Sequence, residues 1–297
     1  MRVILVSSSK PLPAKIDYFI HQCCYPTVLN DCVCRSSIEN DRFFCIGHKP
    51  PEFSPSDDFV HVTPVVKPGL IQLYIPDDCY GDRFHGSILS EYCQLFGLAE
   101  YLKSHGRAQK IYLFQYRKYL SIKAGASVSP NLPYAYACGK IEANLLFPKK
   151  GILEGLGDKL LLGPAIPVKS LADNYSSYHH AEDFSSFVRS LSSVPGFDEK
   201  RIAAFVDCKV LFPAPSLGLF AVECLIGNLD ILRSAWQAFS DLYWCPREGY
   251  QRRVGGFLLE RLQSFLIFED IISPKKIATV QGHQIVVSER REIARTE

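Results

Sequence analysis

Apolar residues in the first 115 positions form short runs that are rich in β-branched and aromatic side chains. Such runs predict buried strands, and Gly, Pro and polar clusters separate them. We predict strands over residues 2–7, 41–47, 59–66, 70–75 and 109–115. The spacing changes to about 3.6 residues in two segments, which predicts helices over residues 14–24 and 89–105.

The helix predicted over residues 89–105 lies between two predicted strands. Leu95, Leu98 and Leu102 line one face of it, Ser87 or Ser90 is placed to cap it, and Glu91 falls in its first turn. A strand, a helix and a strand in this order predict a parallel βαβ unit. We therefore expect an α/β fold with a mostly parallel central sheet flanked by helices.

The pattern after residue 120 is less regular. Residues 125–139 are polar and contain proline, which predicts a surface loop, and residues 141–147 read as a strand before Pro148-Lys149-Lys150. Residues 151–167 support no assignment. The remaining expectations are a helix with an internal turn over 169–190, a strand or buried helix over 202–212, two helices over 217–243, a helix over 254–268, two strands over 277–288 and a charged tail over 289–297.

This pattern suggests a single domain of 297 residues. Residues 1–40 would extend the sheet at its N-terminal side, and residues 165–297 would form a mainly helical half.

Composition supports a folded core and weakens one class of function. The chain is 47% hydrophobic and 22% charged, and its net charge is +2, which argues against a protein that binds nucleic acid through many phosphate contacts. No apolar run approaches the roughly 20 residues of a membrane span, and the first residues do not resemble a signal peptide. We therefore expect a cytoplasmic protein, for which peripheral attachment to a membrane remains open.

The 11 cysteines also fit a reducing compartment, because their number is odd and most are scattered in apolar runs. The cluster of His21, Cys23, Cys24, Cys32 and Cys34 leaves a zinc site open as an alternative to packed thiols.

Several large enzyme classes become less probable because their motifs are missing. The chain contains no G-x-G-x-x-G, G-x-x-x-x-G-K-[ST], H-E-x-x-H or G-x-S-x-G. Dinucleotide oxidoreductases, P-loop NTPases, zincins and ordinary α/β hydrolases are therefore not favoured.

Acidic residues cluster in the turn that follows the predicted strand 70–75. Asp77, Asp78 and Asp82 could hold Mg²⁺ or Mn²⁺ against a diphosphate, since hard cations prefer oxygen ligands. One of these carboxylates could instead act as a base toward a sugar hydroxyl. The alternative is ordinary turn chemistry, in which Asp and Gly are common.

Cationic residues follow two of the predicted strands. His48 and Lys49 come after strand 41–47, and Tyr116, Arg117 and Lys118 come after strand 109–115. Cations at the carboxyl ends of strands suit phosphate binding in α/β proteins. Solvated loop ends are the alternative explanation.

Two further groups carry possible chemistry in the second half. His179 and His180 lie three and four residues from Asp183, so a predicted helix would let them form a metal site or a His–Asp hydrogen bond. Glu260 and Arg261 interrupt an apolar helix, and buried charges require partners. A structural ion pair explains them, and Glu260 facing a substrate is the alternative.

The order of these pieces resembles a family of uncharacterised glycosyltransferase-like proteins from bacterial capsule and exopolysaccharide gene clusters. The matching segments are Gly47-His48-Lys49, Asp77-Asp78…Asp82, Ser90-Glu91-Tyr92, Gln115-Tyr116-Arg117-Lys118-Tyr119, Phe147-Pro148-Lys149-Lys150, Tyr175…His179-His180…Asp183 and Glu260-Arg261-Leu262. Gln115 and Lys118 depart from it, because the pattern has His and Arg at these places, and the chain lacks a clean Asp-x-Asp.

The resemblance implies a GT-A-like (Rossmann-like) fold and transfer of a sugar from a nucleotide-sugar donor to a polysaccharide or glycolipid acceptor. In this reading Asp78, Glu91 and Glu260 are catalytic candidates, and Asp77 and Asp82 are metal candidates. His48, Lys49, Tyr116, Arg117 and Lys118 would bind the donor, and His179, His180 and Asp183 would serve the acceptor or a secondary site. The alternatives are a non-catalytic sugar- or nucleotide-binding protein and a metal-dependent hydrolase or phosphotransferase.

Overall fold

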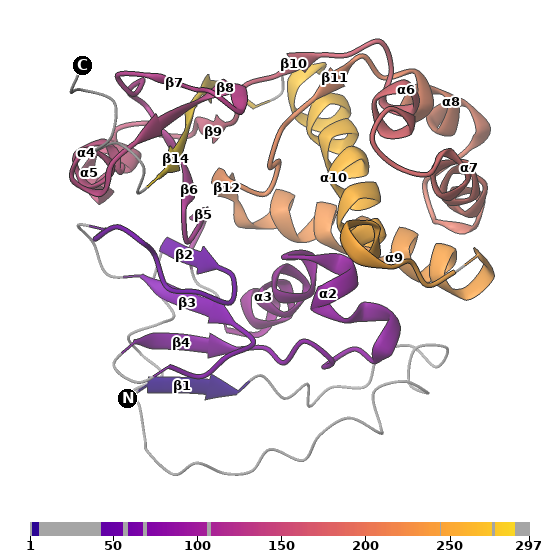
Figure 1. Cartoon of the computed structure of the whole chain (residues 1–297), viewed down its shortest axis with the longest axis horizontal. Helices are drawn as coiled ribbons and strands as arrows, with labels where there is room; N and C mark the ends of the chain where they lie inside the picture. Colours follow the sequence, from indigo (N-terminus) through magenta and orange to yellow (C-terminus); the bar gives the residue numbers. More distant parts are fainter. Residues whose placement is uncertain are drawn as a thin grey trace, which may run out of the picture.

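The computed structural model describes residues 2–5, 43–55, 59–67, 70–105, 108–243, 245–274 and 277–288. Its centre is a 12-stranded sheet whose first part is parallel (Figure 1). The spatial order of these parallel strands is β1 (Arg2–Leu5), β4 (Ile71–Tyr74), β3 (Val60–Thr63), β2 (Phe43–Ile46) and β5 (Lys110–Gln115). Their carboxyl ends share one edge of the sheet, where open α/β folds bind ligands.

The sheet continues beyond β5 with mixed strand directions. In spatial order it adds β6 (Lys118–Ser121), β14 (His283–Val287), β8 (Leu132–Cys138) and β7 (Val128–Ser129). A branch joins β12 (Gly218–Ala221) to β5, and β12 then pairs with β9 (Leu160–Leu162), which pairs with β13 (Thr279–Gln281). A separate ladder joins β10 (Ile166–Pro167) to β11 (Val210–Leu211).

Alternate residues of the strands enter two different cores, one on each face of the sheet. Phe44 and Leu113 belong to the larger core, whereas Cys45 and Phe114 point to the smaller one. This alternation follows from the two-residue period of a strand. Helices cover the larger core, principally α2 (Gly86–Leu89), α3 (Tyr92–His105), α9 (Val222–Tyr243) and α10 (Val254–Leu266), and the smaller core is covered by α4 (Lys140–Leu146) and α5 (Lys150–Glu154) (Figure 1).

Local capping signals place two of the remaining helices. Ser170 caps α6 (Leu171–Ser176) by accepting from the Asp173 amide, and Asp198 caps α8 (Glu199–Asp207) by accepting from the Arg201 amide at 2.7 Å. Between them lies α7 (Ala181–Ser190), so the helix predicted over 169–190 with an internal turn is confirmed as α6 and α7. The short η4 (Gly249–Arg253) leads into α10, which continues as a π-helix over Ile267–Ile272.

The predicted α/β fold with a mostly parallel central sheet is confirmed, but two predicted elements are wrong. Residues 141–147 form helix α4 instead of a strand, with the Ala143 amide bonded to the Gly139 carbonyl. Residues 125–139 contain β7 and β8 instead of a surface loop, because β8 is secured by parallel pairing with the distant β14. Nothing in the local pattern reveals that partner.

Other differences concern element boundaries. The segment 217–243 forms strand β12 followed by the single helix α9, instead of two helices. The segment 277–288 forms the two strands β13 and β14 as predicted, but the strand pair expected there is wrong, because β13 pairs with β9 and β14 pairs with β6 and β8. The ambiguous run 202–212 contains the end of α8 and then β11.

Some expectations fall on residues outside the described ranges. These are the helix 14–24, the tail 289–297 and the cluster of His21, Cys23, Cys24, Cys32 and Cys34. Within the described ranges, no helix combines the length and the apolar character that a membrane crossing would need.

Candidate functional site

A break between α2 and α3 begins the site. The predicted helix 89–105 is interrupted at Ser90, whose φ of 59° and ψ of −133° lie outside helical geometry. Two glycines of α10 allow this break to approach closely. A Cβ on Gly255 would lie 2.6 Å from Leu89 Cδ2, and one on Gly256 would lie 3.0 Å from Ser90 Cβ. The contact directs the chain at Glu91 toward α10.

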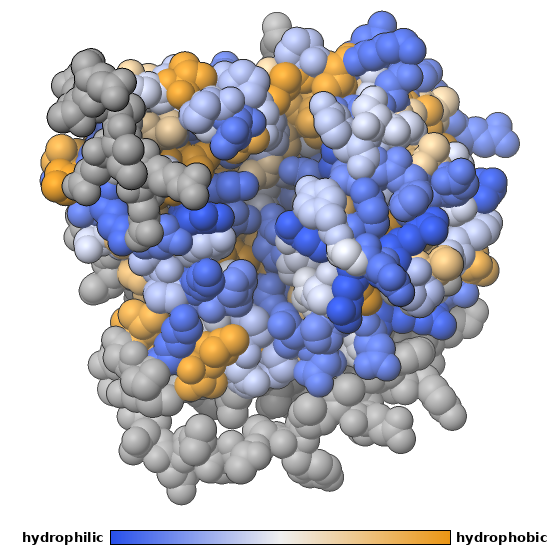
Figure 2. Space-filling model, viewed as in Figure 1, coloured by the Kyte–Doolittle hydropathy of each residue, from blue (hydrophilic) through white to orange (hydrophobic). Residues whose placement is uncertain are grey.

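A cavity of about 210 Å³ lies beside this contact, and Figure 2 shows this face of the molecule hollowed near its centre. Its walls come from the break before α3, the hairpin of β5 and β6, the strands β8 and β14, the segment between β11 and β12, and η4 with α10. The lining residues are Ser90, Glu91, Tyr92, Gln115, Lys118, Tyr134, Pro213, Ala214, Tyr250, Arg253, Gly256, Phe257, Glu260 and Gln284.

Two carboxylates line this cavity, and they have different hydrogen-bond and ion-pair partners. Glu91 Oε1 accepts a hydrogen bond from Gln115 Nε2 at 3.1 Å. Among the described interactions, no cationic side chain forms an ion pair with this carboxylate. Glu260 accepts from the Ala214 amide at 3.2 Å and pairs with Arg261 Nη1 at 2.8 Å. Glu260 is therefore neutralised and fixed, whereas Glu91 is oriented by a neutral donor.

Further contacts stabilise the arginine of the ion pair between Glu260 and Arg261. Arg261 is 6% exposed, and its guanidinium also donates to Asn174 Oδ1 and to the Phe257 carbonyl. The same guanidinium lies 5.7 Å from the centre of the Tyr175 ring. The prediction that Glu260 and Arg261 form a structural ion pair is confirmed, and Glu260 also reaches the cavity.

Backbone strain gathers at the same place. Among the described residues, Ser90 and Ala214 are the non-glycine positions with positive φ, at 59° and 51°, and both line the cavity. Such conformations cost of order 1–3 kcal/mol each and concentrate at functional sites. Ala214 also supplies the amide that fixes Glu260, so its strain serves the site directly.

One buried polar atom in the wall has no partner. Gln284 is 1% exposed and lines the cavity from β14, and its Oε1 accepts no hydrogen bond within the described structure. Buried carbonyl oxygens are nearly always hydrogen-bonded, to protein, water or ligand. This carbonyl oxygen is therefore an unpaired acceptor buried within the wall of the cavity.

The cationic residues predicted for phosphate binding surround one ring beside the cavity. Lys49 Nζ and the Arg117 guanidinium lie 5.7 Å and 4.8 Å from the centre of the Tyr116 ring, and His48 packs 5.8 Å from it. Lys118, the next residue after Arg117, lines the cavity itself. The structure therefore brings together the two cationic segments that follow β2 and β5.

The acidic turn stands apart from this arrangement. Asp77, Asp78 and Asp82 do not line the cavity, and Asp78 and Asp82 are exposed. Asp77 Oδ1 accepts from Gln94 Nε2 at 2.8 Å, and its carboxylate fills the space that a side chain on Gly86 would need. In the described ranges, no group of three or more His, Cys, Asp or Glu is placed to hold a metal. These acids do not form a preformed metal cage there.

The side-chain pairing of His179 or His180 with Asp183, which the sequence allows, is not formed in the described structure, although the Asp183 amide donates to the His180 carbonyl at 3.0 Å. His179 precedes α7, stacks on Phe257 at 4.0 Å and bonds Gln251 Oε1 through Nδ1 at 3.1 Å. Burial lowers the pKa of His179 to about 4, so the ring is neutral near pH 7. Asp183 instead pairs with Arg247, and His180 is exposed.

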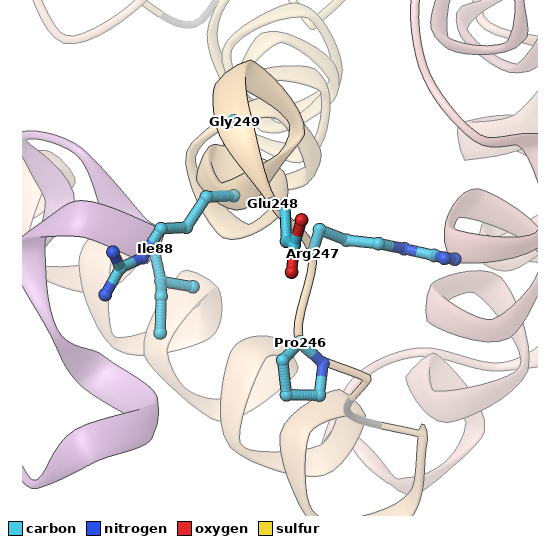
Figure 3. A pocket seen from close by; sticks show the side chains of 6 residues that line it. Ile88, Pro246, Arg247, Glu248 and Gly249 are labelled. Atoms are coloured by element: carbon cyan, nitrogen blue, oxygen red, sulfur yellow. The ribbon is translucent and has the colours of Figure 1, made fainter.

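A second cavity of about 320 Å³ lies on the other side of the segment before α10. Figure 3 shows Ile88, Pro246 and Glu248 around it, with Arg247 extending away from Ile88. That arginine is engaged by Asp183 at 2.8 Å. Glu248 is the carboxylate that lines this cavity, and no strand residue lines it, so it is the weaker candidate.

Several lining residues could not be identified from the sequence. Tyr134, Ala214, Arg253 and Gln284 have no motif around them, and they meet only because β8, β14 and α10 converge. A proline-bearing segment at 213–215 was the single local sign of an unusual backbone near Ala214.

The comparisons with known proteins support the fold. The structure is similar to that of the bifunctional glycosyltransferase WbbM in its apo form, with a TM-score of 0.66 over 84% of this chain and 15% sequence identity. The chain spans 45% of the length of that protein. No known family model matches the sequence, and no curated protein matches it. At this identity the likeness shows a glycosyltransferase-like fold.

We expect the strain at Ser90 to show in stability. Ser90→Gly relieves the strain, because glycine adopts positive φ freely, but it loses the Arg253 contact with Ser90 Oγ just as Ser90→Val does, so the difference between the two variants reports the strain. Ser90→Val should lower the free energy of unfolding by about 1–3 kcal/mol relative to Ser90→Gly, since β-branched residues are disfavoured there. Urea unfolding followed by circular dichroism measures both. Equal stabilities of the two variants would contradict a strained Ser90.

Proposed function

We propose that this chain is a glycosyltransferase that moves a sugar from a nucleotide-sugar donor to a glycan acceptor, a polysaccharide or glycolipid. The observation that carries the proposal is the cavity in which Glu91 and Glu260 meet Lys118 beside the carboxyl ends of β2 and β5. A base, a leaving-group cation and a polar wall are the parts that glycosyl transfer requires. The glycosyltransferase-like fold agrees with this assignment.

Glu91 is the residue we assign as the base. As the acceptor oxygen bonds to the anomeric carbon, its proton passes to the Glu91 carboxylate, and the bond from that carbon to the diphosphate oxygen breaks. Glu91 suits this role because its contact with Gln115 Nε2 orients the carboxylate without neutralising it. Glu260, held by Arg261 and Ala214, would instead orient a substrate hydroxyl.

The cations beside the cavity would bind the donor diphosphate. Lys118 lines the cavity, and His48, Lys49 and Arg117 gather around Tyr116 next to it. Arg forms bidentate contacts with phosphate oxygens, and Lys adds a compact positive charge. Together they would stabilise the negative charge that develops on the leaving diphosphate.

A divalent ion remains part of this proposal. Asp78 and Asp82 are exposed acids near the same edge of the sheet, and Mg²⁺ commonly uses one or two carboxylates together with substrate phosphates. Mg²⁺ or Mn²⁺ bound in this way would neutralise diphosphate charge. Asp77 is less suitable, since it already accepts from Gln94.

The metal-dependent hydrolase receives no support from the geometry on which it relied. It required His179 or His180 beside Asp183, and the structure places Asp183 on Arg247 instead. A non-catalytic sugar- or nucleotide-binding protein would keep the same cavity, and activity assays separate it from a transferase.

We expect a nucleotide sugar to raise the melting temperature. A ligand at about 100 times its Kd adds about 2.7 kcal/mol of stability, which is well resolved by differential scanning fluorimetry. The screen uses UDP-, GDP-, CMP- and ADP-sugars, each with and without Mn²⁺. Arg117→Ala should reduce the shift, whereas Lys200→Ala, which removes an exposed cation of α8, should not.

The pattern of shifts decides between the candidates. If no nucleotide sugar stabilises the protein, the transferase proposal fails. Stabilisation by a free sugar alone supports the binding protein. A shift that needs Mn²⁺ and is lost in Asp78→Asn or Asp82→Asn supports a metal held by this turn.

A further inference from the structure

Consecutive ring contacts extend from the buried core to the mouth of the cavity, through residues of α6, α10 and η4. Tyr175 lies 4.8 Å from His179, and His179 stacks on Phe257 with centroids 4.0 Å apart and planes 17° apart. Phe257 contacts Tyr250 at 5.0 Å. Tyr175 and Phe257 are buried, whereas Tyr250 is 65% exposed and lines the cavity. The outermost ring of this stack therefore faces solvent at the cavity mouth.

The rim is braced by polar contacts. Gln251 joins its two sides, because its Oε1 bonds His179 Nδ1 at 3.1 Å and its Nε2 donates to the Tyr178 carbonyl at 3.1 Å. Tyr178 is 69% exposed. Arg253 completes the brace by donating to Ser90 Oγ at 2.5 Å while lying over the Phe257 ring. These hydrogen bonds fix the backbone segments that carry the two exposed tyrosines.

The segment that carries Tyr250 divides the two cavities. Gly249 and Arg252 line the larger one, and Tyr250 and Arg253 line the smaller one. The smaller cavity is thus lined by this segment as well as by β6, which supplies Lys118. A molecule that reaches Glu91 along Tyr250 would contact η4 and α10, whereas the diphosphate is assigned to Lys118 and to the cations around Tyr116.

The size of the cavity limits what it encloses. Sites that surround a drug-sized ligand measure about 300–1,000 Å³, and this one measures about 210 Å³. It holds the reacting groups, and the rest of a glycan acceptor must extend over the rim. Tyr250 is an exposed aromatic side chain that lines the cavity, and the exposed Tyr178 is joined through its carbonyl to Gln251, the residue after Tyr250.

We propose that Tyr250, with Tyr178 beside it, forms an acceptor subsite in which a sugar ring of the glycan stacks on a tyrosine face. This inference rests on the proposed function and names its second substrate. The face of an aromatic ring carries partial negative charge, which attracts the C–H groups on one face of a sugar. The hydroxyls at the sugar edge then meet polar neighbours, such as Gln251, Arg253 and the Tyr250 hydroxyl.

A lipid chain suits this surface less well. Acyl chains require a continuous apolar groove, and the rings here are bordered by Arg253, Glu248 and Gln251, whose polar groups would lose water without gaining partners. The geometry thus favours the saccharide part of a polysaccharide or glycolipid.

The test measures saccharide binding directly. Saturation-transfer NMR is recorded with methyl glycosides of glucose, galactose, mannose, N-acetylglucosamine and rhamnose on the wild type, Tyr250→Ala, Tyr250→Phe and Tyr243→Ala. Tyr243 is a matched control, because it lies at the end of α9 and does not line the cavity. We expect at least one glycoside to bind, binding to fall at least tenfold in Tyr250→Ala, and binding to persist in Tyr250→Phe and Tyr243→Ala.

Three results would overturn the subsite: no glycoside binds, Tyr250→Ala binds as the wild type does, or octyl chains without a sugar compete as well as the glycosides. The donor melting shift is measured on the same variants. A donor shift that persists in Tyr250→Ala while glycoside binding is lost supports the subsite. Loss of all donor shifts in the wild type, with glycoside binding intact, contradicts the transferase and leaves the saccharide site standing.

Discussion

Glu91→Gln should lower the rate of sugar transfer by about 10²–10⁴, the usual contribution of a general base. Glutamine keeps the size of the side chain and its contact with Gln115, but it cannot accept the acceptor proton. The donor should still bind, because the cations around Tyr116 are unchanged. The rate is measured with the donor that gives the largest melting shift, and the melting shift itself reports binding.

The transfer rate of Asp78→Asn provides the comparison for Glu91→Gln. Both acids are candidates for the base in the sequence, but Asp78 is exposed and lies outside the cavity. We expect Asp78→Asn to retain more transfer than Glu91→Gln, and its loss to shrink at saturating Mn²⁺, because Asp78 is proposed as a metal ligand and not as the base. If Asp78→Asn lost the greater activity and Glu91→Gln were nearly normal, the base would have to be reassigned to the acidic turn.

The second large effect concerns the ion pair beneath the cavity. Glu260→Gln should lower the free energy of unfolding by about 3 kcal/mol, the lower end of the range for breaking a buried pair. The reason is the asymmetry of the pair: the side chain of Arg261 is 7% exposed, whereas that of Glu260 is 31% exposed. Removal of the negative charge leaves the arginine charge buried among neutral acceptors, such as Asn174 Oδ1 and the Phe257 carbonyl.

An exposed pair provides the control for this measurement. Arg83 and Asp241 are bonded at 3.1 Å, and both side chains are about half exposed. Asp241→Asn should therefore change stability by at most about 1 kcal/mol. Urea unfolding of both variants gives the comparison, and equal losses would show that Arg261 finds other compensation. Because Glu260 also faces the cavity, the same variant should transfer more slowly at temperatures where it is fully folded.

Much of the sheet could be predicted from local pattern. The runs that form β2, β3, β4 and β5 are mostly buried and rich in β-branched and aromatic residues, because both faces of a parallel sheet are covered. Their order with α3 predicts the parallel arrangement. The predictions from local pattern are wrong where contacts with a distant segment determine the secondary structure. The β8 segment becomes a strand through pairing with β14, and α4 exposes Ile141 and Leu145 on its outer face, so its apolar residues misled the assignment.

The candidate site divides in the same way. His48, Lys49, Tyr116, Arg117 and Lys118 could be anticipated, because residues after parallel strands are carried to one edge of the sheet. The acids of the turn at 77–82 looked equally suitable, and only the packed structure separates them from Glu91. The pairing of His179 with Asp183 failed because α7 begins after both histidines.

The sequence by itself determined the strand runs, the parallel βαβ unit and the cations after two of the strands, since all of these depend on neighbours along the chain. Only the tertiary structure decided that Glu91 and Glu260 share a cavity. That meeting requires the close contact of Leu89 and Ser90 with two glycines of α10, the positive φ of Ser90 and Ala214, and the convergence of β8 and β14. These are packing relations between distant segments, and local hydrophobic periodicity carries no record of them.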